Sequence, residues 1–332
     1  IAAFFRKLQP FHLKDAPGGA DLISKEEAVM ARGAQTFAAA CASCHSSKQP
    51  PGGIDPQSAE GKSWFAAEVT KPDFLENNFL SSERRIPVDQ VKTNSARAFG
   101  TNAKAGHIWD NFSSETYKNL PRIQDLGFYN PFNEAQPIKY SPTTKDVGAG
   151  YYRVPSLVSL WTSAPFLHNN TLGIFTGDPS VAGRLQAFQD AAEKLLWPEK
   201  RLGKGSIWRT ENECYLHLRK EYVPKPLQAL AGEDGYVKIG PVPKGMPINL
   251  LANLDPDLGD LVVIQAKLVK AFLAIKLRNL TGDEATAELM KAVPEMLAAN
   301  KCPDFVEDKG HYFGTELPDE DKRALIEYLK TF

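Results

Sequence analysis

Apolar and small residues recur at helical spacing near both ends of the chain and once in between. Ser24-Lys25-Glu26-Glu27 has the form of a capping box, and the apolar positions after it predict a helix over residues 24–41. Pro318 precedes acidic residues and a second periodic segment, which predicts a helix over 319–331. A third segment predicts an amphipathic helix over 256–280, with the core-facing residues Leu258, Leu261, Val262, Leu268, Val269, Phe272 and Ile275.

The rest of the chain shows no sustained hydrophobic period. Glycine and proline together account for 48 of the 332 residues, and we find no repeat or low-complexity tract. These features predict loop-rich insertions over about residues 50–255. We therefore expect a mainly α fold, in which residues 1–23 form an N-terminal extension and residues 24–332 form a single domain.

Composition and charge exclude several classes of partner. Hydrophobic residues make up 42% of the chain and charged residues 24%, which is ordinary for a globular protein. The net charge of −1 gives no global field that would attract nucleic acid or an anionic membrane surface. The most apolar stretch, residues 258–280, is interrupted by Asp260, Gln265, Lys267, Lys270, Lys276 and Arg278, so we expect no membrane span.

One five-residue string carries specific chemistry. Residues 41–45 read Cys41-Ala42-Ser43-Cys44-His45, the attachment signature of c-type haem. Chance gives about 0.0009 such strings at this composition and length, so coincidence does not account for it. Two thiols one helical turn apart can each bond a haem vinyl group, and the adjacent imidazole can bind the iron. We expect one covalently attached haem c, held by Cys41 and Cys44, with His45 as its proximal ligand.

The rest of the sequence supports haem attachment at this string. A redox Cys-x-x-Cys pair and half of a zinc site are the alternatives, but no second cysteine pair exists to complete tetrahedral zinc. Gly33 and Phe37 stand on one face of the first predicted helix. In cytochromes c this arrangement lets the N-terminal helix cross closely over the C-terminal helix. These features predict a cytochrome c-type haem domain with large loop-rich insertions.

Two further cysteines, Cys214 and Cys302, lie outside the string. Covalent haem attachment takes place outside the reducing cytosol, where unpaired thiols are a liability. We therefore expect a disulfide between them, which in the chain-entropy model stabilises the fold by roughly 4–5 kcal/mol. Two separate buried thiols are the alternative.

The second axial position of the iron decides between electron transfer and chemistry on a small molecule. His311 lies in Asp308-Lys309-Gly310-His311-Tyr312-Phe313-Gly314, directly before the C-terminal helix. Glycines on both sides allow the backbone to approach a porphyrin closely, and cytochromes c place their distal ligand in such a loop. We expect His311 to be this ligand, which would make the haem a low-potential bis-histidine carrier. An ordinary surface-loop histidine is the alternative.

Several other residues are candidates for the haem pocket. His168, within Ala164-Pro165-Phe166-Leu167-His168-Asn169-Asn170, is expected to orient its neighbours or to bond a haem propionate. Arg153 is a candidate partner of a propionate, because a guanidinium pairs well with a carboxylate. Further candidates are His107 and Met246 for the pocket or the iron, and Arg84, Arg85 and Arg97 for a propionate, although packing or solvation also accounts for each of them. His12 and His217 have no ligand-like context.

Two neighbouring segments, Arg153-Val154-Pro155-Ser156-Leu157 and Thr162-Ser163-Ala164-Pro165-Phe166-Leu167-His168-Asn169, resemble the bacterial di-haem cytochrome c peroxidase superfamily. Within it, the C-terminal half of the di-haem rubber oxygenases is the most similar, and the likeness includes the Cys-Ala-Ser-Cys-His string and the Gly-His-Tyr-Phe-Gly element. The resemblance implies oxygen or peroxide chemistry at one haem, electron relay at another, and a bis-histidine C-terminal haem. This chain departs from the family in having one attachment string and no methionine between His168 and Met246.

We expect an exported, periplasmic or secreted, mono-haem cytochrome that transfers electrons rather than an independent enzyme. It would act alone or as the haem half of a larger oxidoreductase, with a redox protein or a second haem domain as partner. The first alternative is a haem peroxidase or dioxygenase with an open iron site for an apolar substrate, and with His107, Trp109 or His168 in the distal pocket. The second is a subunit whose haem supports the fold. Ile1-Ala2-Ala3-Phe4-Phe5 lacks the features of a signal peptide, so we expect a processed chain or a fragment.

Overall fold

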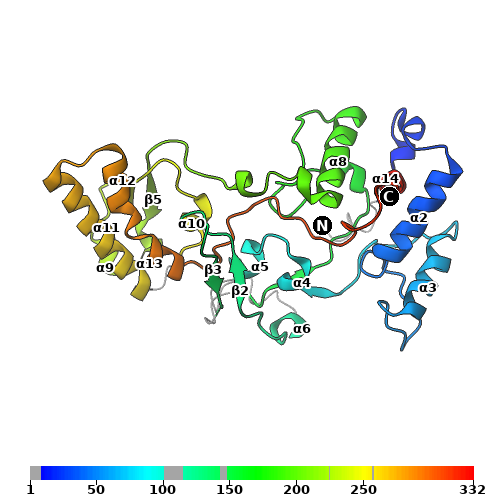
Figure 1. Cartoon of the computed structure of the whole chain (residues 1–332), viewed down its shortest axis with the longest axis horizontal. Coiled ribbons are helices and arrows are strands. Elements are labelled where there is room, and N and C mark those ends of the chain that lie inside the picture. Colours follow the sequence, from blue (N-terminus) through cyan, green and yellow to red (C-terminus); the bar gives the residue numbers. More distant parts are fainter. Residues whose placement is uncertain (1–8, 101–114, 143–147, 224, 256–257) are drawn as a thin grey trace. The chain divides into compact units, whose positions relative to one another are not determined.

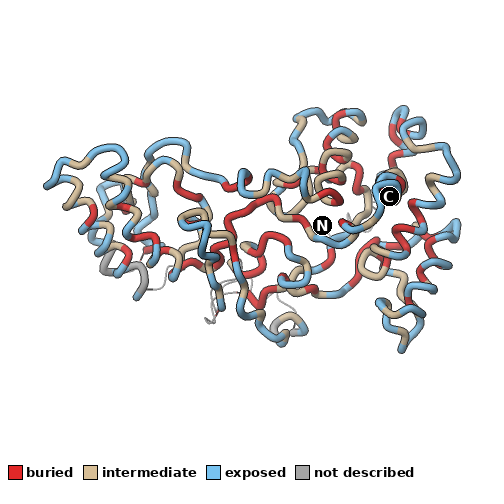
Figure 2. Tube along the Cα trace, viewed as in Figure 1, coloured by how far each residue is buried: buried red, intermediate tan, exposed pale blue. Residues whose placement is uncertain are grey.

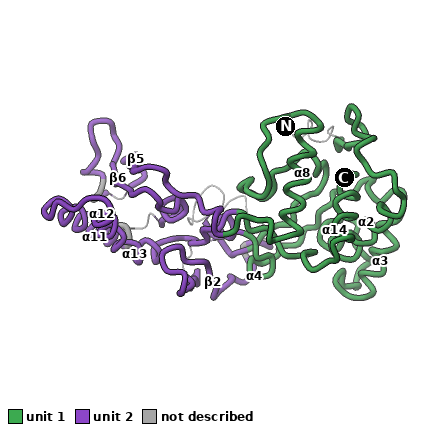
Figure 3. The backbone as a smooth tube through the Cα atoms, turned by 45° about the horizontal axis from the view of Figure 1, so that its top comes forward, with its two compact units in different colours: residues 1–93, 151–203, 308–332 green, residues 94–150, 204–307 purple. Residues whose placement is uncertain are grey.

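The computed structural model describes residues 9–100, 115–142, 148–223, 225–255 and 258–332 (Figure 1). The chain divides into two compact units (Figure 3). The first unit comprises residues 1–93, 151–203 and 308–332, and the second comprises 94–150 and 204–307. Compactness does not establish independent folding, so the division into an extension over 1–23 and one domain over 24–332 stays a prediction.

Both predicted terminal helices are present in the first unit. Helices α2 (Glu27–Ala40) and α14 (Asp319–Leu329) pack against each other (Figure 1). A Cβ atom at Gly33 would lie 2.2 Å from the carbonyl oxygen of Ala324, so only glycine allows this approach. Phe37, one turn later, is fully buried, and its ring meets that of Phe332 edge-on at 4.9 Å between centroids. The expected close helix crossing is confirmed.

The start of α2 differs from its prediction. The Ser24 hydroxyl accepts a hydrogen bond from the backbone N–H of Glu26 at 3.3 Å, and no side chain caps the helix. Ser24 thus forms a local turn with its near neighbour instead of a capping box. The helix begins at Glu27, three residues after the expected position.

The first unit is built around four helices. The other two are α3 (Ala59–Val69) and α8 (Val181–Leu196), and each begins after a serine that caps it. The hydroxyl oxygens of Ser58 and Ser180 accept backbone N–H bonds three residues later, both at 3.1 Å. Buried residues follow the inner faces of these helices (Figure 2) and are mainly Ala34, Phe37, Phe65, Val69, Ala187, Phe188, Ala191, Leu325 and Phe332.

Shorter elements complete the first unit. They are η1 (Leu13–Asp15), η2 (Gly19–Leu22), β1 (Arg85–Pro87), α4 (Val88–Val91), β4 (Tyr151–Arg153), α7 (Leu160–Ser163) and η4 (Pro198–Lys200). Strands β1 and β4 pair antiparallel, with Ile86 opposite Tyr152. This pairing brings the segment after the attachment string next to the segment that precedes His168.

Among the described residues, the second unit contains one long helix, several short helices and two antiparallel strand pairs. The short helix η5 (Gly203–Ser206) begins at the last residue of the first unit and continues into the second. The other elements of the second unit are α5 (Ala96–Gly100), α6 (Glu115–Lys118), β2 (Leu126–Phe128), β3 (Ile138–Tyr140), β5 (Cys214–Arg219), η6 (Lys220–Tyr222), α9 (Lys225–Gln228), β6 (Tyr236–Val242), α10 (Ile248–Ala252), α11 (Leu258–Arg278), α12 (Gly282–Met290) and α13 (Val293–Ala298). Strand β2 pairs with β3, and β5 pairs with β6. Leu250, Ile264, Met296 and Phe305 lie at the centre of its core.

The expectation of a mainly α, cytochrome c-type domain is wrong. The structure is 42% helical and 10% strand, and the described residues form three two-stranded sheets, so helices and strands are mixed. Strands of three residues, such as β1 and β4, are too short to give a period-two signal. Their partners also lie far away in the sequence, so local patterns do not predict the pairing.

Helix α11 is present over the predicted range, but part of its expected core face is exposed. Ile264 and Ala271 are buried, and the helix packs on α12 and α13. Val262 and Val269, expected to face the core, are 46% and 50% exposed. The helix is apolar on more than one face, so its periodicity alone does not select the face that packs.

Two further expectations concern bonds and membranes. The structure does not join Cys214, at the start of β5, to Cys302, which is buried after α13, so the expected disulfide is not seen. No helix among the described residues is long and apolar enough to cross a membrane.

Replacing Gly33 by alanine is expected to lower the free energy of unfolding by about 1–3 kcal/mol, because the added Cβ overlaps the Ala324 carbonyl. Helix propensity acts in the opposite direction, by about 0.5–1 kcal/mol in favour of alanine. Gly259→Ala is the matched control, since Gly259 lies in α11 with no described atom within 4 Å of its Cβ position. Denaturant unfolding followed by circular dichroism measures both. A Gly33→Ala chain as stable as the parent would contradict the close crossing.

Candidate haem site

The attachment string, residues 41–45, begins where α2 ends. The backbone N–H of Cys41 donates to the Phe37 carbonyl, and that of His45 donates to the Cys41 carbonyl, both at 2.9 Å. Ala42 is fully buried and fixes this turn against the core of the first unit. Cys41, Cys44 and His45 are half-buried on one turn of backbone, an arrangement that suits attachment at two vinyl groups.

The thiol of Cys41 does not have the character of a redox cysteine. Burial, with a smaller effect of the Cys44 charge, raises the pKa of Cys41 to about 12. The thiol is therefore protonated at neutral pH, whereas the reactive cysteine of a redox Cys-x-x-Cys pair has a lowered pKa. This environment argues against Cys41 as the reactive thiol of a redox pair.

His45 is held in one tautomer. Its Nδ1 lies 3.2 Å from the carbonyl oxygen of Pro155, and since a carbonyl can only accept, Nδ1 carries the proton. Burial lowers the pKa of His45 to about 4, although the carbonyls of Pro155 and Leu80 act in the opposite direction. The ring is thus neutral at pH 7, and Nε2 keeps its lone pair. A neutral imidazole fixed by a backbone carbonyl is a typical metal ligand.

Two paired segments place the Pro155 carbonyl under His45. The Ser81 hydroxyl donates to the Val154 carbonyl at 2.7 Å, and the Ser156 hydroxyl donates to the Phe79 carbonyl at 2.7 Å. The backbone N–H of Leu157 donates to the Leu80 carbonyl at 3.2 Å. These bonds continue the β1–β4 pairing. They give a role to the Val-Pro-Ser-Leu segment that the sequence singled out only by resemblance.

Arg201 holds the loop that carries His311. Its guanidinium donates to the carbonyl oxygens of Gly310 at 3.1 Å and His311 at 3.0 Å. It also donates to the carbonyls of Lys194 and Leu195 at the end of α8, at 2.7 and 2.8 Å. The loop is therefore attached to α8 by one half-buried cation, which sequence reasoning did not identify.

The glycine before His311 lies in a closely packed position, where a larger residue would displace neighbouring side chains. A Cβ atom at Gly310 would lie 2.7 Å from Cδ1 of Leu195. Gly314 has a φ of +82°, a conformation that favours glycine. The Asp308 carboxylate accepts hydrogen bonds from the backbone N–H groups of Leu202 at 2.6 Å and Gly203 at 3.2 Å. These bonds fix the start of the loop that carries His311.

His311 lies close enough to His45 for the charge of His45 to act on its ring. Burial, followed by the charges of His45 and Arg201, lowers the pKa of His311 to about 3. Both rings are therefore neutral at pH 7. The Nδ1 atom of His311 is buried and has no hydrogen-bond partner, and such an orphaned polar atom is costly unless something binds it. Two neutral imidazoles from distant parts of the chain, one incompletely satisfied, fit the axial ligands of a haem iron.

The arginine candidates for the propionates differ in what they contact. The Nη1 atom of Arg84 lies 3.6 Å from the Cys44 sulfur, next to the attachment string. Arg153 is 59% exposed and pairs with Glu83 at 2.6 Å. Arg85 donates to the Glu83 carbonyl at 2.9 Å, and Arg97 lies in α5 of the second unit. Arg84 is thus the arginine that the structure places at the candidate site.

The remaining candidates lie in other environments. His168 is exposed, and its ring stacks on Tyr152 of β4 at 5.8 Å between centroids. Met246 is 6% exposed within the core of the second unit, where packing accounts for it. His12 contacts the Thr331 carbonyl at 3.3 Å, and His217 lies on β5 beside Tyr236. His107 and Trp109 lie outside the described residues.

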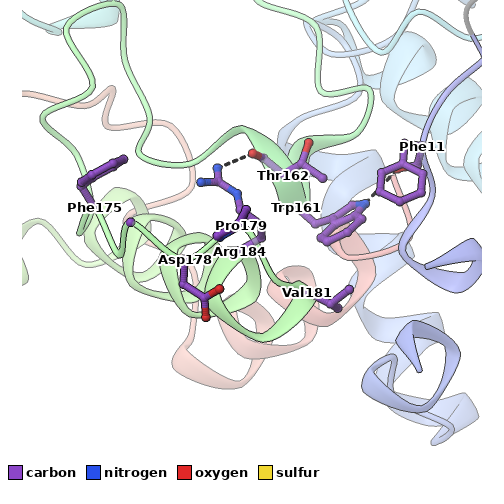
Figure 4. Close-up of a pocket in the computed structure, with 9 residues that line it drawn as sticks. Phe11, Trp161, Thr162, Phe175, Asp178, Pro179, Val181 and Arg184 are labelled. Atoms are coloured by element: carbon purple, nitrogen blue, oxygen red, sulfur yellow. Dashed lines mark hydrogen bonds between the residues drawn. The ribbon is translucent and has the colours of Figure 1, made fainter. Parts of the chain in front are cut away.

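A separate pocket of about 570 Å³ lies beside α8 (Figure 4). Its walls are Phe11, Trp161, Thr162, Phe175, Gly177, Asp178, Pro179, Val181 and Arg184. The Arg184 guanidinium is engaged with the carbonyls of Thr162 and Ala164, and Asp178 is engaged with Ser180. None of these described lining residues belongs to the candidate haem site.

Comparisons with protein-family models, curated proteins and solved structures return no match. Among the described residues, no group of three or more His, Cys, Asp or Glu side chains forms a metal site.

Replacing Arg201 by glutamine is expected to lower the free energy of unfolding by about 1–3 kcal/mol. The reason is that carbonyls at the end of α8 and in the His311 loop lose their hydrogen-bond donor. Arg323→Gln is the matched control. Its side chain is 68% exposed and pairs with Asp319 at 3.6 Å, so the change should stay within about 0.5 kcal/mol. Urea unfolding of both variants measures the difference. Equal stabilities would show that Arg201 does not hold the loop.

Proposed function

We propose that this chain is an exported c-type cytochrome that carries electrons through one haem. Cys41 and Cys44 hold the haem covalently, and His45 and His311 are its axial ligands. The observation that carries the proposal is the nearness of a second neutral imidazole, His311, to the histidine of a Cys-x-x-Cys-His string. The orphaned Nδ1 of His311 adds independent support.

Covalent attachment is an addition that balances without an oxidant. Each thiol adds across one vinyl double bond, so a carbon–sulfur bond forms and the thiol hydrogen passes to the other vinyl carbon. Both cysteines are available for this step, because neither is joined in a disulfide. Such attachment takes place outside the reducing cytosol, which is the reason for proposing export.

Two imidazoles favour electron transfer over substrate chemistry. An iron with both axial positions filled can exchange one electron but has no position open to oxygen or peroxide. Pro155 fixes the ring of His45, and Arg201 fixes the backbone of His311. Rigid ligands reduce the rearrangement that accompanies a change of charge. Arg84 is positioned to pair with a propionate near Cys44.

A haem peroxidase or dioxygenase with an open iron site is the competing function. It requires a distal side without His311 and a catalytic residue in its place. His168 is exposed and stacked on Tyr152, whereas the charge of His45 acts on the buried ring of His311. The electron carrier is therefore the better supported function. A redox protein or a second haem domain, as in the di-haem peroxidase superfamily that the chain resembles, is the proposed partner.

Denaturing mass spectrometry of the intact chain is expected to give the polypeptide mass plus one haem. The Cys41→Ser, Cys44→Ser double variant should give the bare polypeptide mass, because no thioether can form. A Cys214→Ser variant is the control and should keep the added mass. The bare mass in the parent chain, produced in a cell that attaches c-type haem, would refute the proposal.

Replacing His311 by alanine should leave the haem attached but change the iron from low-spin to high-spin, since one strong axial ligand is lost. His311→Met should keep six ligands and raise the reduction potential. His168→Ala is the matched control and should retain the parent's low-spin absorption spectrum. A low-spin spectrum that is unchanged in His311→Ala and lost in His168→Ala would transfer the ligand role to His168.

A further inference from the structure

One face of α11 is apolar and exposed. At about 100° per residue, Val262, Ala266, Val269, Leu273 and Leu277 fall within a stripe about 80° wide and about 22 Å long. The exposed fractions are 46% at Val262, 50% at Val269, 54% at Leu273 and 79% at Leu277. The opposite face, with Ile264 and Ala271, is buried in the second unit. Figure 2 colours much of this helix as exposed or intermediate.

Basic residues border this apolar stripe on both sides. On the same helical projection, Lys276 lies along one edge and Lys270 along the other. From residue 262 to residue 278 the sequence contains four basic residues and no acidic residue. The chain as a whole has a net charge of −1, so its overall balance conceals this local excess of positive charge.

These four basic residues differ in their contacts. Lys267 pairs with Glu295 of α13, and Arg278 pairs with Glu288 of α12 at 3.1 Å. These two pairs hold α11 on its neighbours. Lys270 and Lys276 are exposed and form no salt bridge with any residue that the structure describes. The two charges next to the apolar stripe are therefore available to an external partner.

We propose that this face of α11 binds an anionic phospholipid surface. The valines and leucines would enter the boundary between headgroups and acyl chains, and the lysines would extend to the phosphates on either side. This arrangement is typical of helices that lie in the plane of a membrane interface. The inference is independent of the proposed haem.

Residue types favour a lipid surface over a protein partner. Cores of protein interfaces are enriched in aromatic residues, methionine and arginine, and lysine is depleted there. The stripe on α11 consists of valine, alanine and leucine, and its borders are lysines. A bilayer offers apolar chains beneath a continuous layer of phosphates, which matches an aliphatic stripe with one free lysine on each side.

Sedimentation of the full chain with lipid vesicles tests the proposal. We expect binding to vesicles of equal parts phosphatidylglycerol and phosphatidylcholine, little binding to phosphatidylcholine alone, and weaker binding at high salt. The Lys270→Gln, Lys276→Gln variant should bind the mixed vesicles about 25-fold more weakly, at about fivefold per lysine. The Leu273→Gln, Leu277→Gln variant should bind at least about tenfold more weakly.

The matched control replaces the same residue types elsewhere. Leu202 is 71% exposed and Lys62 is exposed on α3, and the Leu202→Gln, Lys62→Gln variant should bind as the parent does. Circular dichroism checks that every variant is folded. Absence of binding to the mixed vesicles, equal binding to uncharged vesicles, or unchanged binding by either α11 variant would overturn the proposal. A dimer in analytical ultracentrifugation that the leucine variant dissociates would also overturn it, in favour of a second copy of the chain.

Discussion

The contact between Gly33 of α2 and Ala324 of α14 determines where both proposed haem ligands lie. The attachment string leaves the C-terminal end of α2 directly, and His311 lies a few residues before α14 begins. Because the two helices cross as closely as a glycine allows, they bring together two segments that are separated by most of the sequence. A larger residue at position 33 would separate the helices and, with them, the two histidines.

The rest of the first unit fixes these two segments after the crossing has brought them together. The paired segments around Leu80 and Pro155 orient the ring of His45 through a backbone carbonyl, and Arg201 connects the His311 loop to the end of α8. Burial keeps both imidazoles neutral, which is the form that binds iron. Without a cofactor, this arrangement leaves Nδ1 of His311 buried and without a hydrogen-bond partner, which destabilises the folded protein. Binding of a cofactor by this ring would offset part of that destabilisation.

The sequence predicts what depends on local pattern. Periodicity located α2, α11 and α14, and the attachment string is recognisable because its residues are consecutive. It did not predict β1 and β4, since strands of three residues that pair across the chain leave no local signal. Arg201 was also missed, because its acceptors are backbone carbonyls and the two in the His311 loop lie about 110 residues away. For α11, two apolar faces compete, and only tertiary packing decides that Ile264 is buried while Val262 is exposed.

The central claim is that His45 and His311 occupy both axial positions of one iron. Carbon monoxide added to the reduced protein tests it directly, because the gas binds ferrous haem at an open position. The account predicts an absorption spectrum that stays low-spin and changes little on addition of the gas. Prompt conversion to the carbon monoxide spectrum would contradict it and would indicate an open iron site instead.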